Sequence, residues 1–271
     1  MFKLYNMSMF RSLGAFTNRF ARIVFVYLFA FYARQGMAAN TNSPIGYLGN
    51  NYQEAQKRFD TETNDAVAAW EFGRACFDMS ALQKNSSAEA RFAEEGIAAC
   101  KRALALVPNS APAHYYLGMD MGQLADTKRN LSALRMVKDM EREFLAAQVL
   151  DKHFDYAGPD RNLGLLYRDA PVIASIGSRS KARKHLEEAV ELAPEFPENQ
   201  LNLVEVYLKW DYQKEAARQF EELEKMWPEA QKKFTGVAWV LSWADWNKRL
   251  DTVKKKFEKN PKVIEPPHSA Q

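Results

Sequence analysis

The chain has 271 residues, of which 47% are hydrophobic and 26% are charged, so it can bury a core and is not disordered throughout. Its formal net charge is +3, but all five charged residues before residue 40 are basic, which leaves 32 basic against 34 acidic residues in the rest of the chain. The basic excess therefore belongs to the N-terminal segment and does not indicate a general polyanion-binding surface.

Residues 1–39 have the layout of a secretory signal peptide. Scattered Arg and Lys residues precede an uninterrupted apolar run at 23–33, and the small residues Gly36 and Ala38 follow it. At ~1.5 Å per residue, this run spans only about half of a ~30 Å hydrocarbon core, which favours a cleaved leader over a membrane span. Cleavage is predicted after Ala38 or Ala39, and the mature protein is expected to be periplasmic or secreted. The alternative is an uncleaved leader that tethers the chain to a membrane.

After a linker at 40–50, residues 51–258 are predicted to form one all-α domain, and residues 259–271 a disordered tail. Ala, Leu, Glu and Lys prevail over Ile and Val in this domain, which favours helices over strands. Apolar residues recur at spacings of three and four, as in Leu201, Val204 and Leu208, and the prolines fall between such patterns.

An internal repeat organises the domain. The residues Ala182, Leu186, Ala189 and Pro194 recur 34 positions later as Ala216, Phe220, Leu223 and Pro228. A first-helix signature occurs four times, at Phe72-Gly73 with Cys76, Leu117-Gly118 with Met121, Leu163-Gly164 with Tyr167, and Leu203-Val204 with Tyr207. This pattern resembles the tetratricopeptide repeat (TPR), which implies a solenoid of helical hairpins, here about four irregular repeats. The last repeat is predicted to have helices at Glu198–Lys209 and Lys214–Met226, with Pro228 ending the second.

Two further segments flank the repeats. The connection at 169–180 contains Gly and Ser and is predicted to be a surface loop, where an inserted functional element is first to be sought. Residues 229–258 are predicted to form a C-terminal cap, in which Trp239, Trp243 and Trp246 share one face. That face is expected to cover the end of the solenoid or, alternatively, to form the aromatic wall of a ligand cleft.

Catalytic motifs are missing from the sequence. There is no HExxH, GxSxG, P-loop or CxxC pattern, so the chain is expected not to be an enzyme and to need no cofactor or metal. We interpret His114 as a packed core residue and His185 as a solvated one. Cys76 and Cys100 are expected either to pair in an oxidising compartment or to be small buried residues.

Candidate binding residues follow from the repeat, because its first helices line a concave groove in the family it resembles. The expected groove residues are Arg161, Arg168, Asn162, Arg74, Tyr115, Tyr116, Asn202 and Glu205. Seven residues are nearly two helical turns, so Arg161 and Arg168 share a stripe that suits a peptide or an organic anion. The alternative is that both pair with Asp160, Asp169 or Glu205 and only join neighbouring repeats.

A narrower resemblance involves residues 144–227. The segment GPDRNLGLLYRDAP at 158–171, followed by KARKHLEEAVELAPEFPEN at 181–199, is similar to the T component of TRAP-type solute transporters. That family implies a periplasmic helical-repeat protein with a ligand cleft, self-association, and docking to the transporter's solute-binding protein. Its members typically carry a lipid anchor on a cysteine, which this chain lacks near its leader.

These observations predict an exported, non-enzymatic TPR module that binds a partner protein or peptide in its groove. The partner implied by the resemblance is a transporter solute-binding protein, and homo-oligomers are consistent with it. The alternative is a soluble carrier of a hydrophobic or amphipathic small molecule. The lysine run 254–256 is typical of a solvated helix face, so nucleic acid is not an expected partner. Contact with a membrane is expected only through an uncleaved leader.

Overall fold

A computed structural model of the protein describes residues 43–128, 131–172 and 175–259. The predicted leader at 1–39 and all but the first residue of the predicted tail lie outside these residues. Every regular element within them is helical: α2 (Pro44–Thr61), α3 (Ala66–Leu82), α4 (Ser86–Leu106), α5 (Ala111–Thr127), α6 (Leu131–Leu150), α7 (Phe154–Asp169), α8 (Arg179–Leu192), α9 (Pro197–Lys209), α10 (Gln213–Lys233), the 3₁₀ helix η1 (Val237–Trp239) and α11 (Val240–Glu258).

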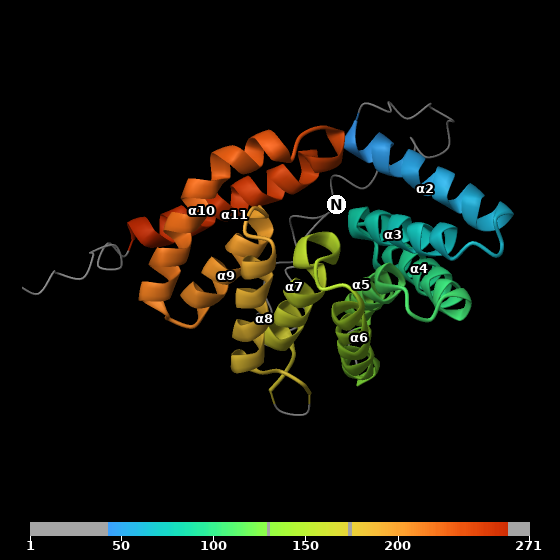
Figure 1. Ribbon diagram of the computed structural model, residues 1–271, viewed down its shortest axis with the longest axis horizontal. Coiled ribbons are helices and arrows are strands. Elements are labelled where there is room, and N and C mark those ends of the chain that lie inside the picture. Colours follow the sequence, from blue (N-terminus) through green and yellow to red (C-terminus); the bar gives the residue numbers. More distant parts are fainter. Residues whose placement is uncertain (1–42, 129–130, 173–174, 260–271) are drawn as a thin grey trace, which may run out of the picture.

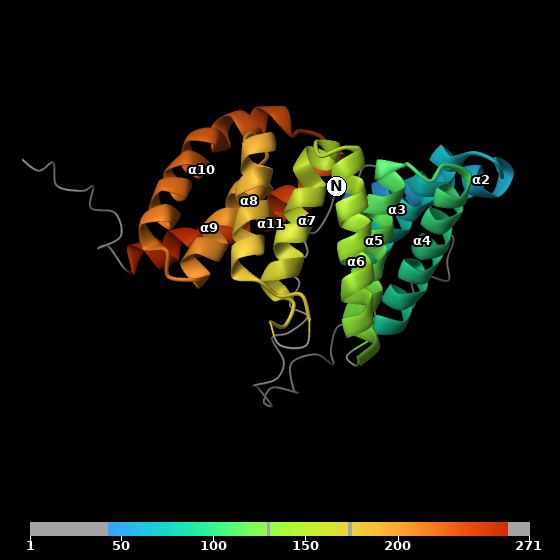
Figure 2. The ribbon, with the colours of Figure 1, turned by 60° about the horizontal axis from the view of Figure 1, so that its bottom comes forward.

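The helices pack as hairpins in chain order, α3 with α4, α5 with α6, α7 with α8, and α9 with α10. Figure 2 shows these hairpins side by side, and Figure 1 shows that they curve into an arch. At the open side of the arch, α2 contacts η1, so the two ends of the array meet. The predicted all-α, TPR-like hairpin solenoid with a C-terminal capping helix is confirmed.

Capping residues explain where several helices begin. The side chains of Asp65 and Asn85 accept hydrogen bonds from the backbone N–H groups of Val67 (2.7 Å) and Ser87 (2.8 Å). These contacts satisfy donors that the first turn of a helix leaves without partners. Prolines in the first turns of α5 and α9 favour a helix start in another way. The proline ring fixes φ near the helical value, and the N–H that proline lacks would have no partner within the helix at this position.

Glycines in the first-helix signature allow close approach between paired helices. A Cβ atom at Gly118 would lie 2.7 Å from the Phe144 ring, and one at Gly164 would lie 2.6 Å from Leu186 Cγ. Phe144 and Leu186 are both buried, so neither could move away without opening the core. The signature Leu-Gly is therefore explained by the packing of α5 on α6 and of α7 on α8.

Two helix boundaries differ from the prediction. Helix α2 begins at Pro44, inside the segment 40–50 expected to be a linker, and the side chain of Ser43 caps it. Helix α10 continues through Pro228 to Lys233 instead of ending at Met226. Proline removes one hydrogen bond from a helix, but the buried residues Trp227 and Ala230 extend the apolar face past it. Burial of that apolar face therefore stabilises the helix by more than the hydrogen bond lost at Pro228 destabilises it.

Three smaller expectations can be compared with the structure. Cys76 and Cys100 are buried and both are free thiols, which matches the second of the two predicted states. His114 is packed as predicted, with Nδ1 2.6 Å from Glu143 Oε2. The solvated role for His185 is wrong, because its Nδ1 lies 2.7 Å from Asp160 Oδ1 and its ring stacks on Tyr167.

In the part of the chain from 43 to 259 that the structure describes, none of the helices combines the length and the apolar character needed to cross a bilayer.

Candidate functional site

The start of α7 contains a left-handed turn. Asp155, Tyr156 and Ala157 have φ angles of 52°, 56° and 59°, although none of them is glycine. The left-handed conformation disfavours residues with a Cβ by roughly 1–2 kcal/mol each. Such strain persists only where the surroundings hold it, and it is concentrated at functional sites in proteins.

Arg161 and Asn199 hold this turn through its carbonyl groups. Arg161 Nη1 donates to the backbone oxygens of Asp155 (3.1 Å) and Tyr156 (3.0 Å). Asn199 Nδ2, from α9, donates to the same Tyr156 oxygen (3.0 Å). Because the strained turn is fixed from two helices, the direction of the Asp155 side chain is fixed with it.

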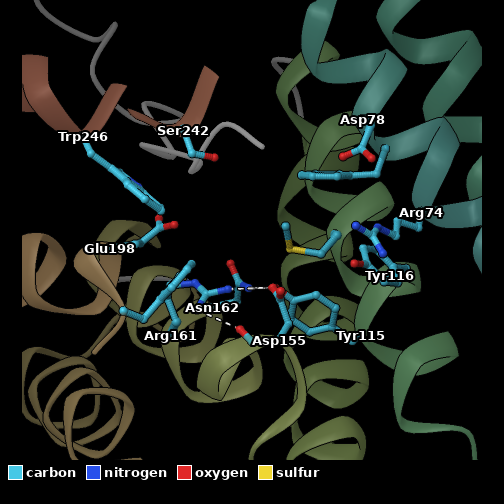
Figure 3. A pocket seen from close by; sticks show the side chains of 13 residues that line it. Arg74, Asp78, Tyr115, Tyr116, Asp155, Arg161, Asn162, Glu198, Ser242 and Trp246 are labelled. Atoms are coloured by element: carbon cyan, nitrogen blue, oxygen red, sulfur yellow. Dashed lines mark hydrogen bonds and ion pairs between the residues drawn. The ribbon is translucent and has the colours of Figure 1, made fainter. Parts of the chain in front are cut away.

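The Asp155 carboxylate joins a buried hydrogen-bond network. Its Oδ2 accepts from Arg161 Nη2 (2.7 Å) and from the Tyr115 hydroxyl (2.7 Å). The Tyr115 oxygen in turn accepts from Asn162 Nδ2 (3.0 Å), and burial raises the pKa of the Tyr115 phenol well above its ordinary value. Figure 3 shows Arg161, Asn162, Asp155 and Tyr115 together along one side of a cavity.

This cavity, which we call the inner cavity, has a volume of about 30 Å³ and lies among the first helices α3, α5, α7 and α9 and the capping helix α11. Charged and aromatic side chains dominate its lining, which consists of Arg74, Phe77, Asp78, Tyr115, Tyr116, Met119, Asp155, Arg161, Asn162, Phe196, Glu198, Ser242 and Trp246. The first helices thus line the concave side, as the TPR resemblance implies.

A second cavity, which we call the outer pocket, has a volume of about 300 Å³. Four aromatic residues contribute to its lining, which consists of Trp70, Arg74, Tyr116, His153, Phe154, Asp155 and Tyr156. Arg74, Tyr116 and Asp155 line both cavities, so the inner cavity and the outer pocket meet at these residues. Together they form one cleft with an aromatic entrance and a polar interior.

Arg74 is the half-buried cation at that junction. Among the described residues, no hydrogen bond or ion pair within 4.0 Å is formed by its guanidinium group. Its electrostatic neighbours are Tyr116, Asp78 and Asp155. A partly desolvated guanidinium without a close partner is a favourable site for an anionic or carbonyl oxygen.

Two buried acids lie on opposite sides of the inner cavity, Asp78 on the side of Arg74 and Glu198 across from it (Figure 3). Burial raises the pKa of Asp78, and it raises that of Glu198 to about 7, against the attraction of Arg161 and Arg249. Glu198 is 3% exposed, and its Oε1 accepts no hydrogen bond from the described residues. The closest cation is Arg249, whose Nη1 lies 3.8 Å from Glu198 Oε1.

The structure brings five of the eight predicted site residues to this cleft and leaves three elsewhere. The five that line the inner cavity are Arg74, Tyr115, Tyr116, Arg161 and Asn162. Arg161 is nevertheless 3% exposed, and its Nη1 and Nη2 are occupied by the network at the left-handed turn, while Nε has no hydrogen-bond partner among the described residues. Its main contacts are therefore internal, as the alternative interpretation of the arginine stripe expected, but its acidic partner is Asp155 and none of the three acids predicted.

The other three residues, Arg168, Asn202 and Glu205, line neither cavity because neighbouring side chains engage them. Arg168 Nη2 donates to Asp169 Oδ2 (2.6 Å), one of the predicted alternative partners. Arg249 reaches the other two, with Nη2 2.6 Å from Asn202 Oδ1 and Nε 2.9 Å from Glu205 Oε1. Although burial opposes ionisation, Arg249 keeps the pKa of Glu205 below its ordinary value.

Four important residues were not predicted as binding residues: Asp78, Asp155, Glu198 and Arg249. Asp78 had a usable signal, because it lies four residues after Arg74 and so on the same face of a largely apolar helix. Trp246 fits both roles predicted for the tryptophan face, that of covering the end of the solenoid and that of forming the wall of a ligand cleft. It is buried in the core beneath the C-terminal cap, and it also lines the inner cavity. The described residues of the connection at 169–180, where a functional insertion was to be sought first, contribute to neither cavity.

Comparison with known proteins gives a family match for part of the chain. Residues 42–156 match the model of the family described as "RMD1-3: Regulator of microtubule dynamics protein 1-3". The match covers less than half of the 271 residues and includes α2 to α6 and the first two residues of the left-handed turn. No curated protein sequence matches the chain.

Two solved structures described as MamA are similar in fold. One has 18% sequence identity and a TM-score of 0.46, with 68% of this chain and 91% of that chain covered. The other has 17% identity and a TM-score of 0.40, with 79% and 87% covered. The resemblance to the T component of TRAP-type transporters is not confirmed by these matches and stays a prediction.

Proposed function

We propose that the protein is a non-enzymatic interaction module that holds a segment of a partner protein or peptide in the cleft formed by the outer pocket and the inner cavity. The observation that carries this proposal is Arg74, a half-buried cation at the junction of two cavities with no close partner among the described residues. Its guanidinium suits a carboxylate or a backbone carbonyl of the bound segment.

The dimensions and walls of the cleft support a short segment as the ligand. The volume of the outer pocket, about 300 Å³, lies at the lower end of the range of ligand sites, which is ~300–1,000 Å³. Trp70, Phe154 and Tyr156 offer rigid apolar surface for one or two side chains. The family description, which names regulators of microtubule dynamics, also favours a protein partner over a chemical substrate.

Replacing Arg74 by glutamine is expected to weaken binding of a partner peptide, identified by pull-down with the full chain, by tenfold or more. A charge-assisted hydrogen bond contributes about 1.5–3 kcal/mol, and glutamine keeps a hydrogen-bonding amide but neither the charge nor the full reach of arginine. Isothermal titration calorimetry measures the effect. The matched control is Arg218→Gln on the exposed face of α10, which should bind with unchanged affinity. Equal affinity of the Arg74 variant would exclude the cleft as the binding site.

A carrier of a small amphipathic molecule is the second candidate function. It is favoured by the four aromatic residues of the outer pocket, which could enclose an apolar body while Arg74 holds a polar end. Native mass spectrometry of protein from its own host separates the two functions. A reproducible small-molecule adduct supports the carrier, and a copurifying polypeptide supports the interaction module.

Export belongs to the same proposal and rests on the sequence of residues 1–39. Protein recovered from the periplasm or the medium is expected to begin at Ala39 or Asn40, which intact-mass measurement detects directly. Replacing Val26 and Phe29 by aspartate should keep the chain inside the cell, because both residues lie in the apolar run. An exported protein that still begins at Met1 would contradict a cleaved leader. In an exported chain, the solute-binding protein of a transporter is the specific partner we propose.

A further inference from the structure

We propose that the inner cavity is a binding site for the ammonium group of a lysine side chain, held between Asp78 of α3 and Glu198 of α9. This inference rests on the proposed function, because the lysine would belong to the bound segment. The segment would pass through the outer pocket, and its lysine would enter the inner cavity beside Arg74.

The placement of the two acids is the first argument. Figure 3 shows Asp78 and Glu198 on opposite sides of the cavity, with both carboxylates directed into the space between them. Both residues are at least nine-tenths buried, with exposures of 7% and 3%. Glu198 Oε1, which lines this space, is an acceptor with no hydrogen-bond partner among the described residues, and an ammonium group could donate to it. Buried polar atoms of this kind normally have partners, so they indicate a missing ligand or water.

The charge of the lining is the second argument. Three carboxylates and two guanidinium groups line the inner cavity. Asp155 and Arg161 neutralise each other at 2.7 Å, which leaves Asp78 and Glu198 against Arg74. Arg161 and Arg249 both attract Glu198, but each is shared with another carboxylate: Arg161 with Asp155, and Arg249 with Glu205, which it contacts through two nitrogens at 2.9 Å, and with Asp245 at 3.7 Å. An added positive charge would therefore be attracted to the space between the two acids.

Size and wall chemistry select the ammonium group. A cavity of about 30 Å³ holds about two water-sized groups, which suits a compact ammonium better than the wider guanidinium fork. Phe77, Tyr116 and Trp246 supply aromatic surface beside the acids, and aromatic rings attract cations. The four-carbon stem of lysine would lie mainly in the larger outer pocket, so that only the ammonium end enters the inner cavity, while Arg74 binds a neighbouring acidic or carbonyl oxygen.

Binding at this site should depend on pH. The groups that face Glu198 are Arg161 and Asp155 of α7 and Arg249 and Asp245 of α11, and burial leaves the pKa of Glu198 at about 7. Ammonium binding favours the ionised carboxylate, so below pH 7 the site must first release a proton. The affinity should therefore rise roughly tenfold between about pH 6 and pH 8 and become constant at higher pH.

The test is selection of a random 12-residue peptide library on the full chain at pH 8. We expect the selected peptides to share a lysine at one position, and replacement of that lysine by norleucine to weaken binding at least tenfold. The variant Asp78→Asn/Glu198→Gln should lose the lysine preference but still bind through the remaining positions. The control Glu221→Gln/Asp251→Asn removes two exposed carboxylates and should keep the preference. Circular dichroism confirms that each variant is folded.

The possible outcomes separate this inference from the proposed function. Selected peptides that share no lysine, or that accept arginine or norleucine equally well, would overturn the ammonium site and leave peptide binding intact. A lysine preference that survives in Asp78→Asn/Glu198→Gln would place the ammonium outside the inner cavity and also overturn the inference. If no peptide is selected at all, peptide binding by the cleft is itself refuted.

Discussion

Replacing Arg161 by methionine is expected to lower the free energy of unfolding by about 3–5 kcal/mol, the effect typical of removing one partner of a buried ion pair. The guanidinium is 3% exposed and pairs with Asp155 Oδ2 at 2.7 Å. It also donates to the backbone oxygens of Asp155 and Tyr156, which keeps three non-glycine residues in the left-handed conformation. The substitution would leave a buried carboxylate without its cation and release the strained turn at the same time.

Urea-induced unfolding, followed by circular dichroism, measures this effect. The matched control is Arg142→Met, because Arg142 also pairs with acids but its side chain is 65% exposed. Arg142 itself is exposed, and its buried partner Glu143 keeps its contact with His114 at 2.6 Å, so this variant should lose only about 0–1 kcal/mol. A loss below 1 kcal/mol in the Arg161 variant would show that Asn199 and the packing of α7 suffice to hold the turn.

The comparison of these two arginines also shows why the fold was easier to predict than the site. Helices and hairpins follow from local spacing, so the Leu-Gly pair at 163–164 and the apolar positions of 216–223 identified their elements directly. The sequence placed Arg161 and Arg168 on one stripe because both lie on one helix. Which of them faces the cleft depends on α3, α5 and α9, whose positions relative to α7 are not encoded in local spacing.

Two features of the site had no local signal. The left-handed turn at 155–157 contains neither glycine nor asparagine, and only Asp155 is of a residue type that adopts this conformation even occasionally. Its contacts come from Arg161 later in the same helix and from Asn199 on another hairpin. Glu198 likewise follows Pro197 at a helix start, where an acidic residue is ordinary. Its unusual environment arises only when α11 closes the array and brings Trp246 and Arg249 against α9.

That environment leads to the second large effect: replacing Glu198 by glutamine is expected to stabilise the protein at pH 8 by roughly 3 kcal/mol. Burial raises the pKa of this carboxyl from 4.5 to about 7 in the folded state. Between these two values the folded chain keeps a proton that the unfolded chain releases, so stability falls as the pH rises from about 4.5 to 7. Above pH 7 the carboxylate is ionised in the folded chain as well, and the cost of burying its charge lowers the free energy of unfolding by the full amount. Glutamine cannot ionise, so the variant should lose this contribution to the fall in stability between about pH 4.5 and 7.

Glu205→Gln is the matched control, since it makes the same change seven residues later on α9 with the opposite expected sign. Arg249 contacts both Glu205 oxygens at 2.9 Å and keeps the pKa of Glu205 below its ordinary value. Loss of that carboxylate should therefore destabilise the protein at pH 8. Urea unfolding at pH 5 and pH 8 measures both variants, and a Glu198 variant that is less stable than the parent at pH 8 would show a net favourable Glu198–Arg249 pair.

The stability gained by Glu198→Gln bears on why a glutamate stands there. A buried carboxylate that accepts no hydrogen bond at Oε1 and raises the free energy of the fold is poorly explained by stability alone. Stability is commonly reduced at sites that bind a ligand, because the same groups that fit the ligand are mismatched without it. A variant that is more stable and has lost the lysine preference would connect the two effects in one residue. A variant that is more stable and binds unchanged would separate them, and Glu198 would then contribute only to the pH dependence of folding.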